Sequence, residues 1–249
     1  MKDIKDNFSS YASNYANYRP TSPNELYEFL YSKVNDFTTA WDCGTGNGQI
    51  AVHLADKFKT VYATDISSKQ LELAEKKDNI VYLLERAEQT SLEDNSVDLI
   101  TVAQAVHWFD FDAFNKEATR VAKNNAIIAL ITYYTPKFDT AVDKLIDELY
   151  WDITRKYWDK ERQYVDDKYQ TIPFPYDEFE VPEMKIVLNW DIEQALGYLR
   201  TWSGVQHYIK QNNEDPVSII EPRLRNIWDS NQIKKVQFPL FIRGGKIVK

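Results

Sequence analysis

The feature that most constrains this 249-residue chain is an alternation of strand-like and helix-like segments between residue 36 and about residue 132. Apolar, β-branched runs predict strands at 38–43, 60–65, 80–84, 97–103 and 126–131. Segments with helical apolar spacing fall between some of these runs, at 49–58, 67–77 and 112–121. Strands that alternate with helices favour a parallel sheet covered on both faces. We therefore expect a doubly wound, mostly parallel α/β core.

Beyond Pro136 the pattern becomes mainly helical. Helical spacing recurs at 138–157, 192–209 and 222–228, whereas 184–190 alternates like a strand. The last apolar run, 236–242, also predicts a strand, and because Pro239 lacks an N–H we expect that strand at an edge of the sheet. We expect this edge strand to be antiparallel. No Gly/Ser-rich linker separates these parts, so we expect a single domain. Its expected parts are N-terminal lid helices (1–35), a ligand-binding core (36–135), a helical cap with one strand (136–235) and the final strand (236–249).

Charge and composition argue against several classes of protein. With 30 Lys and Arg against 38 Asp and Glu, the net charge is −8. The chain therefore lacks the excess of basic residues that is typical of nucleic-acid-binding proteins. The single Cys43 and three scattered histidines offer neither a disulfide nor a zinc site. The chain has no apolar run long enough for a membrane span, and its first residues are polar where a signal peptide needs an apolar stretch, so we expect neither feature. We expect a cytoplasmic protein without metal, nucleic-acid or membrane partners, and the oligomeric state stays open.

Three of only seven glycines lie within residues 44–48, directly after the first predicted strand and before a predicted helix. Such a turn lets a ligand approach the main chain and the N–H groups of the helix N-terminus. The G-x-G-x-G spacing places the third glycine one residue earlier than the dinucleotide fingerprint does. The cluster therefore indicates a loop that binds a nucleoside without a pyrophosphate. A tight turn without a ligand is the alternative.

Asp65 ends the second predicted strand, about twenty residues after the glycine cluster. A carboxylate at that place can accept hydrogen bonds from both hydroxyls of a ribose. The alternative is an ordinary, solvated aspartate at the end of a strand.

The N-terminal segment predicts a helix with an aromatic face, formed by Phe8, Tyr11, Tyr15 and Tyr18. Pro20 favours an extended conformation at Arg19, where that helix must end. A lid of this kind could close over a ligand, with the Arg19 guanidinium pairing a carboxylate as a two-pronged donor. Alternatively, the helix packs its rings on the core and leaves Arg19 at the surface.

Five motifs follow one another along the chain: Trp-Asp-Cys-Gly-Thr-Gly-Asn-Gly at 41–48, Thr-Asp-Ile-Ser at 64–67, Arg-Ala-Glu at 86–88, Ser-Val-Asp-Leu-Ile at 96–100 and Gln-Ala-Val-His-Trp-Phe at 104–109. In this order they resemble the motifs of class I S-adenosylmethionine (SAM)-dependent methyltransferases. Segments 17–20 and 198–203 resemble the small-molecule branch that includes trans-aconitate methyltransferase and related methyltransferase type 11 proteins. The resemblance covers nearly the whole chain. It implies a Rossmann-like fold with a cap, SAM as cofactor, and a small acceptor that could carry a carboxylate.

The resemblance also implies which residues bind the cofactor. Those expected at the methionine part of SAM are Arg19, Asp42, Gly44, Gly46 and Gly48, and Tyr18 of the lid is also expected to bind the cofactor. Asp65 is expected at the ribose, with Ile66 packing on the adenine and Ala87 and Glu88 at the adenine edge. Gln104 is expected at the end of the fourth strand, nearest the transferred methyl group.

His107 follows the fourth predicted strand, where α/β folds place reacting groups. Methyl transfer needs an aligned acceptor in a dry pocket. A carboxylate acceptor needs no base, whereas a hydroxyl or amine must lose a proton, for which His107 is the catalytic candidate. His107 could instead orient its loop. Trp108, Tyr133 and Trp202 are expected to line the acceptor side, where rings can face a sulfonium, although each could also be core.

Two other functions are compatible with this pattern. An NAD-linked oxidoreductase uses a similar sheet, but the early third glycine argues against it. A non-catalytic SAM-binding sensor shares the cofactor motifs and differs only in a blocked acceptor side. We expect a methyltransferase that acts on a small organic molecule.

Overall fold

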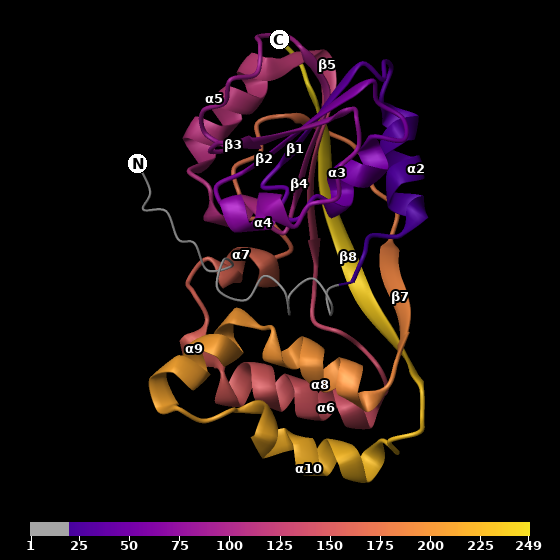
Figure 1. The fold of residues 1–249 in the computed structure, drawn as a ribbon, viewed down its shortest axis with the longest axis vertical. Helices are drawn as coiled ribbons and strands as arrows, with labels where there is room; N and C mark the ends of the chain where they lie inside the picture. The colour runs from indigo at the N-terminus through magenta and orange to yellow at the C-terminus, as the bar shows by residue number, and fades with distance from the viewer. Residues whose placement is uncertain (1–19) are drawn as a thin grey trace.

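The computed structural model describes residues 20–249 and is built on a mixed sheet (Figure 1). Within these residues the eight strands follow the order β3-β2-β1-β4-β5-β8-β6, with β7 paired to β8. Five strands are parallel: β1 (Thr39–Cys43), β2 (Thr60–Asp65), β3 (Ile80–Leu84), β4 (Val97–Ala103) and β5 (Ala122–Tyr133). The predicted doubly wound core is confirmed.

Helices cover both faces of the parallel strands (Figure 1). Helices α2 (Asn24–Lys33) and α3 (Gln49–Leu54) pack on one face, and α5 (Phe111–Val121) packs on the other. Short α4 (Ser68–Glu72) begins at Ser67, whose hydroxyl accepts from the Gln70 N–H. An apolar cluster lies on each face of the sheet, and successive residues of β5 pack alternately into one cluster and the other. The apolar run of β5 is therefore continuous. No helix within residues 20–249 is long and apolar enough to cross a membrane.

Strand β8 (Lys234–Ile247) is antiparallel, as predicted, but it does not lie at the edge of the sheet. Its second half pairs with β5, and its first half pairs with β7 (Met184–Trp190). The short strand β6 (Asp177–Glu178) covers the other side of its C-terminal end. The predicted edge position of the final strand is therefore wrong.

Pro239 fits this interior strand because it lies where the pairing partner changes. Its carbonyl accepts a hydrogen bond from the N–H of Tyr134, 3.0 Å away and just beyond the end of β5. In a β-strand, the N–H and the C=O of the same residue point toward the same neighbouring strand. The missing N–H of Pro239 therefore faces a place where the ladder with β5 has already ended.

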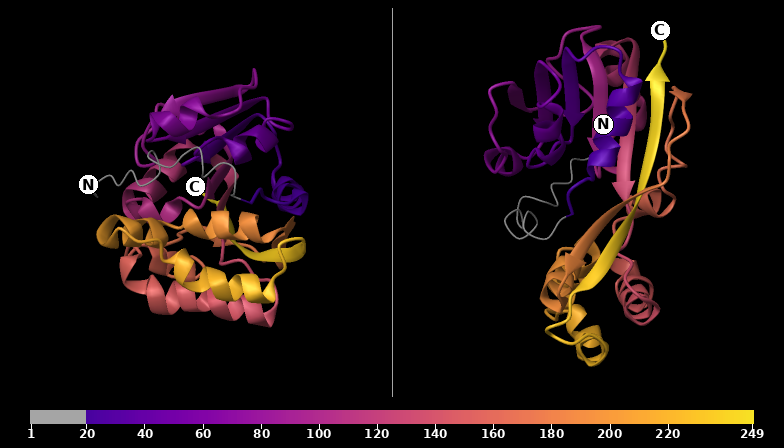
Figure 2. Two further views of the ribbon diagram at one scale, coloured as in Figure 1. Left: turned by 60° about the horizontal axis from the view of Figure 1, so that its bottom comes forward. Right: turned by 90° about the vertical axis from the view of Figure 1, so that its right-hand side faces the viewer.

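The cap is a lobe of helices joined to the sheet by the long strand β8 (Figure 2). Its helical segments are α6 (Thr140–Asp147), the π-helical turn η2 (Glu148–Ile153), η3 (Arg155–Tyr157), α8 (Ile192–Arg200), α9 (Ser203–Asn212) and α10 (Val217–Ile227). The single helix predicted over 192–209 is two helices, because Trp202 has an extended backbone with ψ 132°. The helix predicted over 138–157 is likewise divided: the regular α-helix stops at Asp147, and η2 and η3 follow it.

Part of the inserted segment returns to the core after α7 (Arg162–Asp166). Lys168 and Tyr169 both have left-handed backbones, with φ of 56° and 62°, where the chain reverses. Tyr169 is buried there, in the same apolar cluster as Phe114 of α5. This turn brings the inserted segment against the loop that follows β4.

Candidate functional site: a cavity at the carboxyl ends of the parallel strands

The glycine-rich turn after β1 has the backbone that its glycines predict. Gly44, Gly46 and Gly48 have φ of 68°, 57° and 83°, in the left-handed region that side chains disfavour. A Cβ on Gly44 would lie 2.6 Å from the Cβ of Ala105, and one on Gly48 would lie 2.5 Å from the Tyr82 hydroxyl. The turn therefore needs glycine at both positions for its torsions and for the close approach of neighbouring elements.

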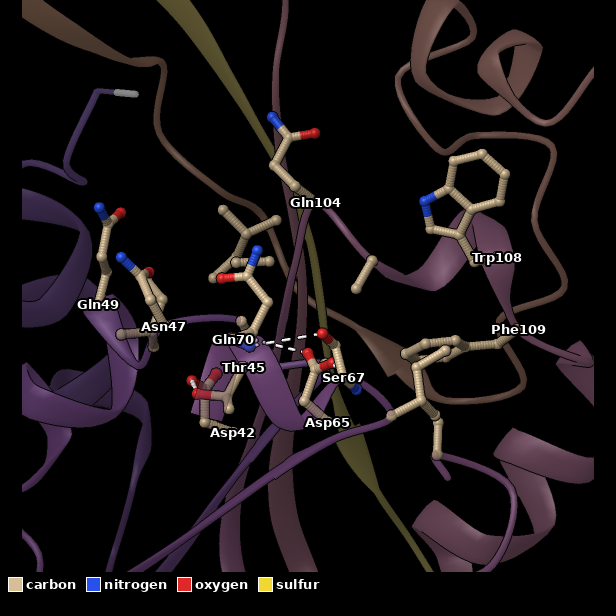
Figure 3. Close-up of a pocket in the computed structure, with 18 of the residues that line it drawn as sticks. Asp42, Thr45, Asn47, Gln49, Asp65, Ser67, Gln70, Gln104, Trp108 and Phe109 are labelled. Atoms are coloured by element: carbon tan, nitrogen blue, oxygen red, sulfur yellow. Dashed lines mark hydrogen bonds between the residues drawn. The ribbon is translucent and has the colours of Figure 1, made fainter. Parts of the chain in front are cut away.

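Asp65, at the end of β2, is fixed by two backbone N–H groups. Its Oδ2 accepts from Gly46 at 2.8 Å and its Oδ1 accepts from Ser67 at 2.9 Å. Each carboxylate oxygen can accept a further hydrogen bond. The half-buried side chain lines a cavity beside the glycine turn (Figure 3). Asp65 is thus a carboxylate at the cavity wall whose orientation two backbone N–H groups fix.

This cavity has a volume of about 400 Å³ and lies at the carboxyl ends of β1, β2 and β4. Its size falls in the range of small-molecule sites, which is roughly 300–1,000 Å³. The predicted cofactor residues that line it are Asp42, Gly44, Gly46, Asp65, Ile66, Ala87, Glu88 and Gln104. Gly48 does not line it and instead occupies the N-cap of α3. Tyr18 and Arg19 lie outside the described residues.

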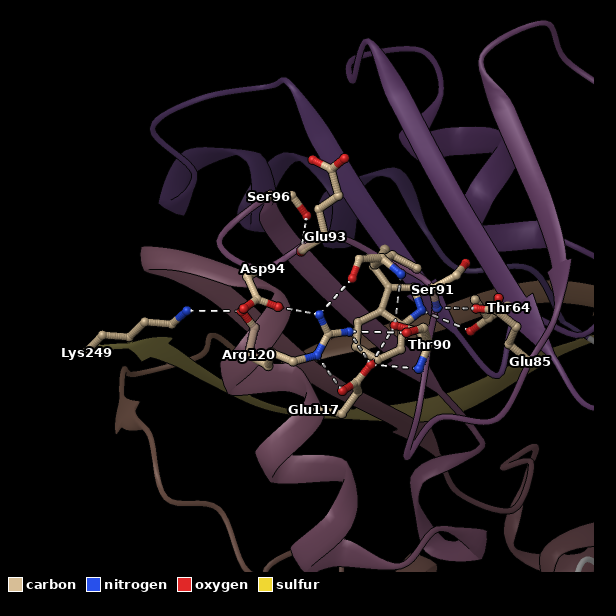
Figure 4. A network of polar contacts seen from close by, with 12 residues as sticks. Thr64, Glu85, Thr90, Ser91, Glu93, Asp94, Ser96, Glu117, Arg120 and Lys249 are labelled. Atoms are coloured by element: carbon tan, nitrogen blue, oxygen red, sulfur yellow. Dashed lines mark hydrogen bonds and ion pairs between the residues drawn. The ribbon is translucent and has the colours of Figure 1, made fainter.

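The loop after β3, which carries Glu88, is anchored to α5 (Figure 4). Glu117 Oε1 accepts from both the N–H and the hydroxyl of Thr90, each at 2.7 Å, and it also pairs with Arg120. Glu88 Oε1 accepts from the N–H of Asp110 at 3.0 Å. These contacts fix the part of the cavity wall that includes Ala87 and Glu88.

Asp42 is buried beneath the glycine turn and accepts from two hydroxyls, those of Thr45 and Thr101. Burial disfavours its charged form and raises its pKa to about 6, although both hydroxyls act in the opposite direction. The nearby carboxylate of Asp65 raises the pKa of Asp42 as well. Asp42 therefore titrates close to neutral pH in the folded protein.

We expect Asp42 to make the stability of the ligand-free protein depend on pH. Its folded-state pKa of about 6 exceeds the ordinary 3.8, so the folded protein holds this proton more tightly. The resulting stabilisation is complete below about pH 4 and is lost as pH rises through about 6. The loss is on the order of 3 kcal/mol. Urea unfolding between pH 4 and 7 should show this component in the wild type and not in Asp42→Asn; the same pH dependence in both proteins would contradict it.

Gln104 directly follows the end of β4 and has a left-handed backbone, with φ of 55°. Its side-chain Nε2 donates to the carbonyl of Tyr133 at 3.2 Å, and its Oε1 accepts from the Thr132 hydroxyl at 3.1 Å. In the view of Figure 3, Gln104 and Trp108 lie away from Asp42 and Asp65. Gln104 is therefore a fixed part of the wall opposite the glycine turn.

A second, smaller cavity adjoins the first and shares Gln104, Trp108 and Tyr133 with it. Trp202 and His107 line only this smaller cavity. The structure thus places each predicted acceptor-side ring in a cavity wall. His107 is buried, and its Nδ1 lies 2.8 Å from the Tyr169 hydroxyl, so one ring nitrogen already has a partner.

Several lining residues have no role in the sequence interpretation. Thr45 and Asn47 lie within the glycine cluster, and Gln70 lies in the first turn of the helix after β2. Their positions next to predicted site residues could have indicated that they line the cavity. Lys160 and Glu161 reach the larger cavity from the cap. No pattern in the sequence marks them, because their segment lies in a stretch whose fold depends on distant packing.

Comparisons with known proteins agree with this geometry. Residues 41–130 match a family described as "Methyltransferase domain". A "putative methyltransferase" from Dictyostelium discoideum is 34% identical over 95% of this chain and 93% of that protein. The structure of a "putative type II methyltransferase" from Anaeromyxobacter dehalogenans shares 37% identity over 92% of this chain and 98% of that chain, with a TM-score of 0.86. A Haemonchus contortus phosphoethanolamine N-methyltransferase shares the fold alone, at 16% identity over 97% of this chain and 58% of that chain, with a TM-score of 0.50.

A doubly wound sheet with a glycine-rich turn and a cavity at its carboxyl ends, together with these matches, defines a methyltransferase with a Rossmann-like fold. The chain belongs to the class I SAM-dependent methyltransferase family. The Dictyostelium and Anaeromyxobacter matches each cover more than nine tenths of the chain, so the similarity extends into the cap.

Proposed function

We propose that the protein transfers a methyl group from SAM to a small organic molecule that carries a carboxylate. The observation that carries the proposal is the Asp65 carboxylate, which two backbone N–H groups hold at the wall of a cavity of about 400 Å³. SAM would supply a methyl group on a sulfonium for in-line displacement by the acceptor. The acidic net charge of −8 supports a small acceptor rather than a nucleic acid.

The residues of the larger cavity fit SAM. The glycine turn presents a backbone surface without side chains, which suits the close approach of a ligand. Asp65 would accept the two ribose hydroxyls, and Ile66, which is 43% exposed, would offer an apolar surface to the adenine. Asp42 lies beneath the turn, where a carboxylate favours an amino group. The Haemonchus protein of the same fold was solved with S-adenosylhomocysteine (SAH).

The acceptor would lie between the end of β4 and the cap. Gln104, Trp108 and Tyr133 belong to both cavities and would hold the acceptor between them in a site that excludes water. A carboxylate that accepts the methyl group is already ionised at neutral pH and needs no base. For a hydroxyl or amine acceptor, His107 would take the proton, with its ring oriented by Tyr169.

A His107→Ala variant separates these two kinds of acceptor. If His107 is a base, turnover of a hydroxyl or amine acceptor should fall about 100-fold or more, while SAM affinity stays unchanged. Tyr169→Phe should lower the rate less and shift its pH profile, because the partner of His107 Nδ1 is lost. Single-turnover kinetics and calorimetry measure the two quantities. Unaltered rates with every acceptor would make His107 a residue that only orients its loop.

A screen of small organic acids, phenols and amines for SAH release tests the function directly. We expect SAH release with at least one organic acid, and none from the same acid with Asp65→Ala at a SAM concentration that saturates only the wild type. SAM binding without turnover of any compound would contradict the proposal and favour a SAM-binding sensor.

A further inference from the structure

The smaller cavity lies where the core meets the cap, beside the proposed cofactor cavity. Its volume is about 50 Å³, and its wall includes Trp158 and Arg162 of the cap as well as Thr135 after β5. One water needs roughly 10–15 Å³ of such space. The cavity therefore accommodates a group of only a few heavy atoms, such as a carboxylate and the carbon that bears it.

Thr135 gives this cavity a buried polar atom that the described chain does not satisfy. The residue is 3% exposed, and its Oγ1 has no hydrogen-bond partner within residues 20–249. Buried hydroxyls in native proteins nearly always have partners, because an unsatisfied one is costly. Since Thr135 lines the cavity, a polar group placed there is the partner that the site can accommodate.

Arg162 gives the same cavity a planar cation. Its Nε donates to the Tyr150 hydroxyl at 2.8 Å and lies 3.6 Å from Oδ1 of Asp166. Its guanidinium carbon lies 4.7 Å from the centroid of the Trp158 ring. These contacts orient the guanidinium. Neither of its two Nη atoms makes a hydrogen bond within the described residues. A carboxylate is the group that matches such a planar fork of N–H donors.

Arg162 shares its carboxylate partner with a second arginine. Asp166 is shared with Arg155, whose Nη1 lies 3.0 Å from its Oδ2, so two guanidinium groups face one carboxylate. Arg155, Arg162 and Asp166 together therefore carry one positive charge in excess. Asp159, the one carboxylate among the described residues that line the smaller cavity, lies 3.8 Å from Nδ1 of His207.

We propose that Arg162 and Thr135 anchor a carboxylate of the acceptor in the smaller cavity, at a distance from the group that is methylated. The inference rests on the proposed methyltransferase function and defines its substrate class more closely. The acceptor is a small organic acid with a second functional group, which lies at the wall shared by Gln104, Trp108 and Tyr133. The rings of Trp158 and Trp202 limit the size of the anchored end.

The test is calorimetric titration of the SAH-saturated protein with malonate, succinate and glutarate and with their neutral diamides. We expect at least one diacid to bind about tenfold or more tightly than its diamide, because only the acid pairs with the guanidinium. Arg162→Met should abolish this preference, and Arg162→Lys, which keeps the charge without the fork, should retain part of it. Persistence of the full preference in Arg162→Met would overturn the proposal.

Thr135→Val gives a second, independent readout. It should weaken binding of that diacid about three- to tenfold while leaving the melting temperature of the ligand-free protein equal or higher, because it removes a buried hydroxyl without a partner. Thr135→Ser should retain diacid binding. A Thr135→Val variant that binds the diacid as the wild type does would show that the hydroxyl takes no part.

Arg155→Met is the matched control, because Arg155 pairs with the same Asp166 but lines neither cavity. It should keep the diacid preference, and all variants should bind SAH as the wild type does. Equal loss of the preference in Arg155→Met, or no diacid preference in the wild type, would overturn the proposal. Failure of the wild type to bind SAH would instead contradict the proposed function, and the inference would fail with it.

Discussion

Asp65→Ala is expected to weaken SAM binding by at least about 100-fold. The substitution removes the acceptor of two ligand hydroxyls, and a hydrogen bond to a charged group contributes roughly 1.5–3 kcal/mol. It also releases the N–H groups of Gly46 and Ser67, which the carboxylate now holds in place. Isothermal titration calorimetry of the wild type and the variant measures the change.

Asp78→Ala is a suitable control for this experiment, since Asp78 is an exposed carboxylate that does not line the cavity. It should bind SAM as the wild type does, which would exclude a general effect of lost negative charge. If Asp65→Ala retained wild-type affinity while remaining folded, Asp65 could not be the ribose ligand.

Gly44→Ala is expected to destabilise the fold by roughly 2–5 kcal/mol. The backbone at Gly44 is left-handed, with φ of 68°, which costs a side chain about 1–2 kcal/mol. The added Cβ would also lie 2.6 Å from the Cβ of Ala105, and such overpacking typically costs about 1–3 kcal/mol more. Urea unfolding followed by circular dichroism measures the loss.

Gly46→Ala is the matched comparison for Gly44→Ala. Its backbone is also left-handed, with φ of 57°, but the nearest atom to an added Cβ is Gln70 Oε1 at 3.9 Å. We expect a loss of only about 1–2 kcal/mol, from backbone strain alone. Equal destabilisation of the two variants would show that the contact with Ala105 does not matter.

The sequence predicts the parallel core closely because its signals there are local. The bounds of β2, β3 and β4 match the predicted strands, since each is an apolar run bounded by polar residues. The left-handed backbone of Gly44, Gly46 and Gly48 also follows from residue type, because glycine alone adopts it without strain. The cavity-lining position of Asp65 follows from its place at a strand end.

The cap and the interior position of β8 depend on long-range packing, which a single sequence does not reveal. Pro239 predicts an edge strand by local chemistry, but β8 changes partner at that residue and the missing N–H costs no ladder bond. Trp202 lies within a stretch of helical spacing, yet its extended backbone divides the helix. Arg162 and Thr135 lie far apart in sequence, and only the folded chain brings them to one cavity.

The most direct test of the central claim is calorimetric titration of the full chain with SAM, SAH and NAD in parallel. We expect SAM and SAH to bind saturably with one molecule per chain, and NAD to give no binding heat, because the turn at Gly44, Gly46 and Gly48 has the spacing of a nucleoside site without a pyrophosphate. Binding of NAD without binding of SAM or SAH would contradict the assignment of this cavity to SAM.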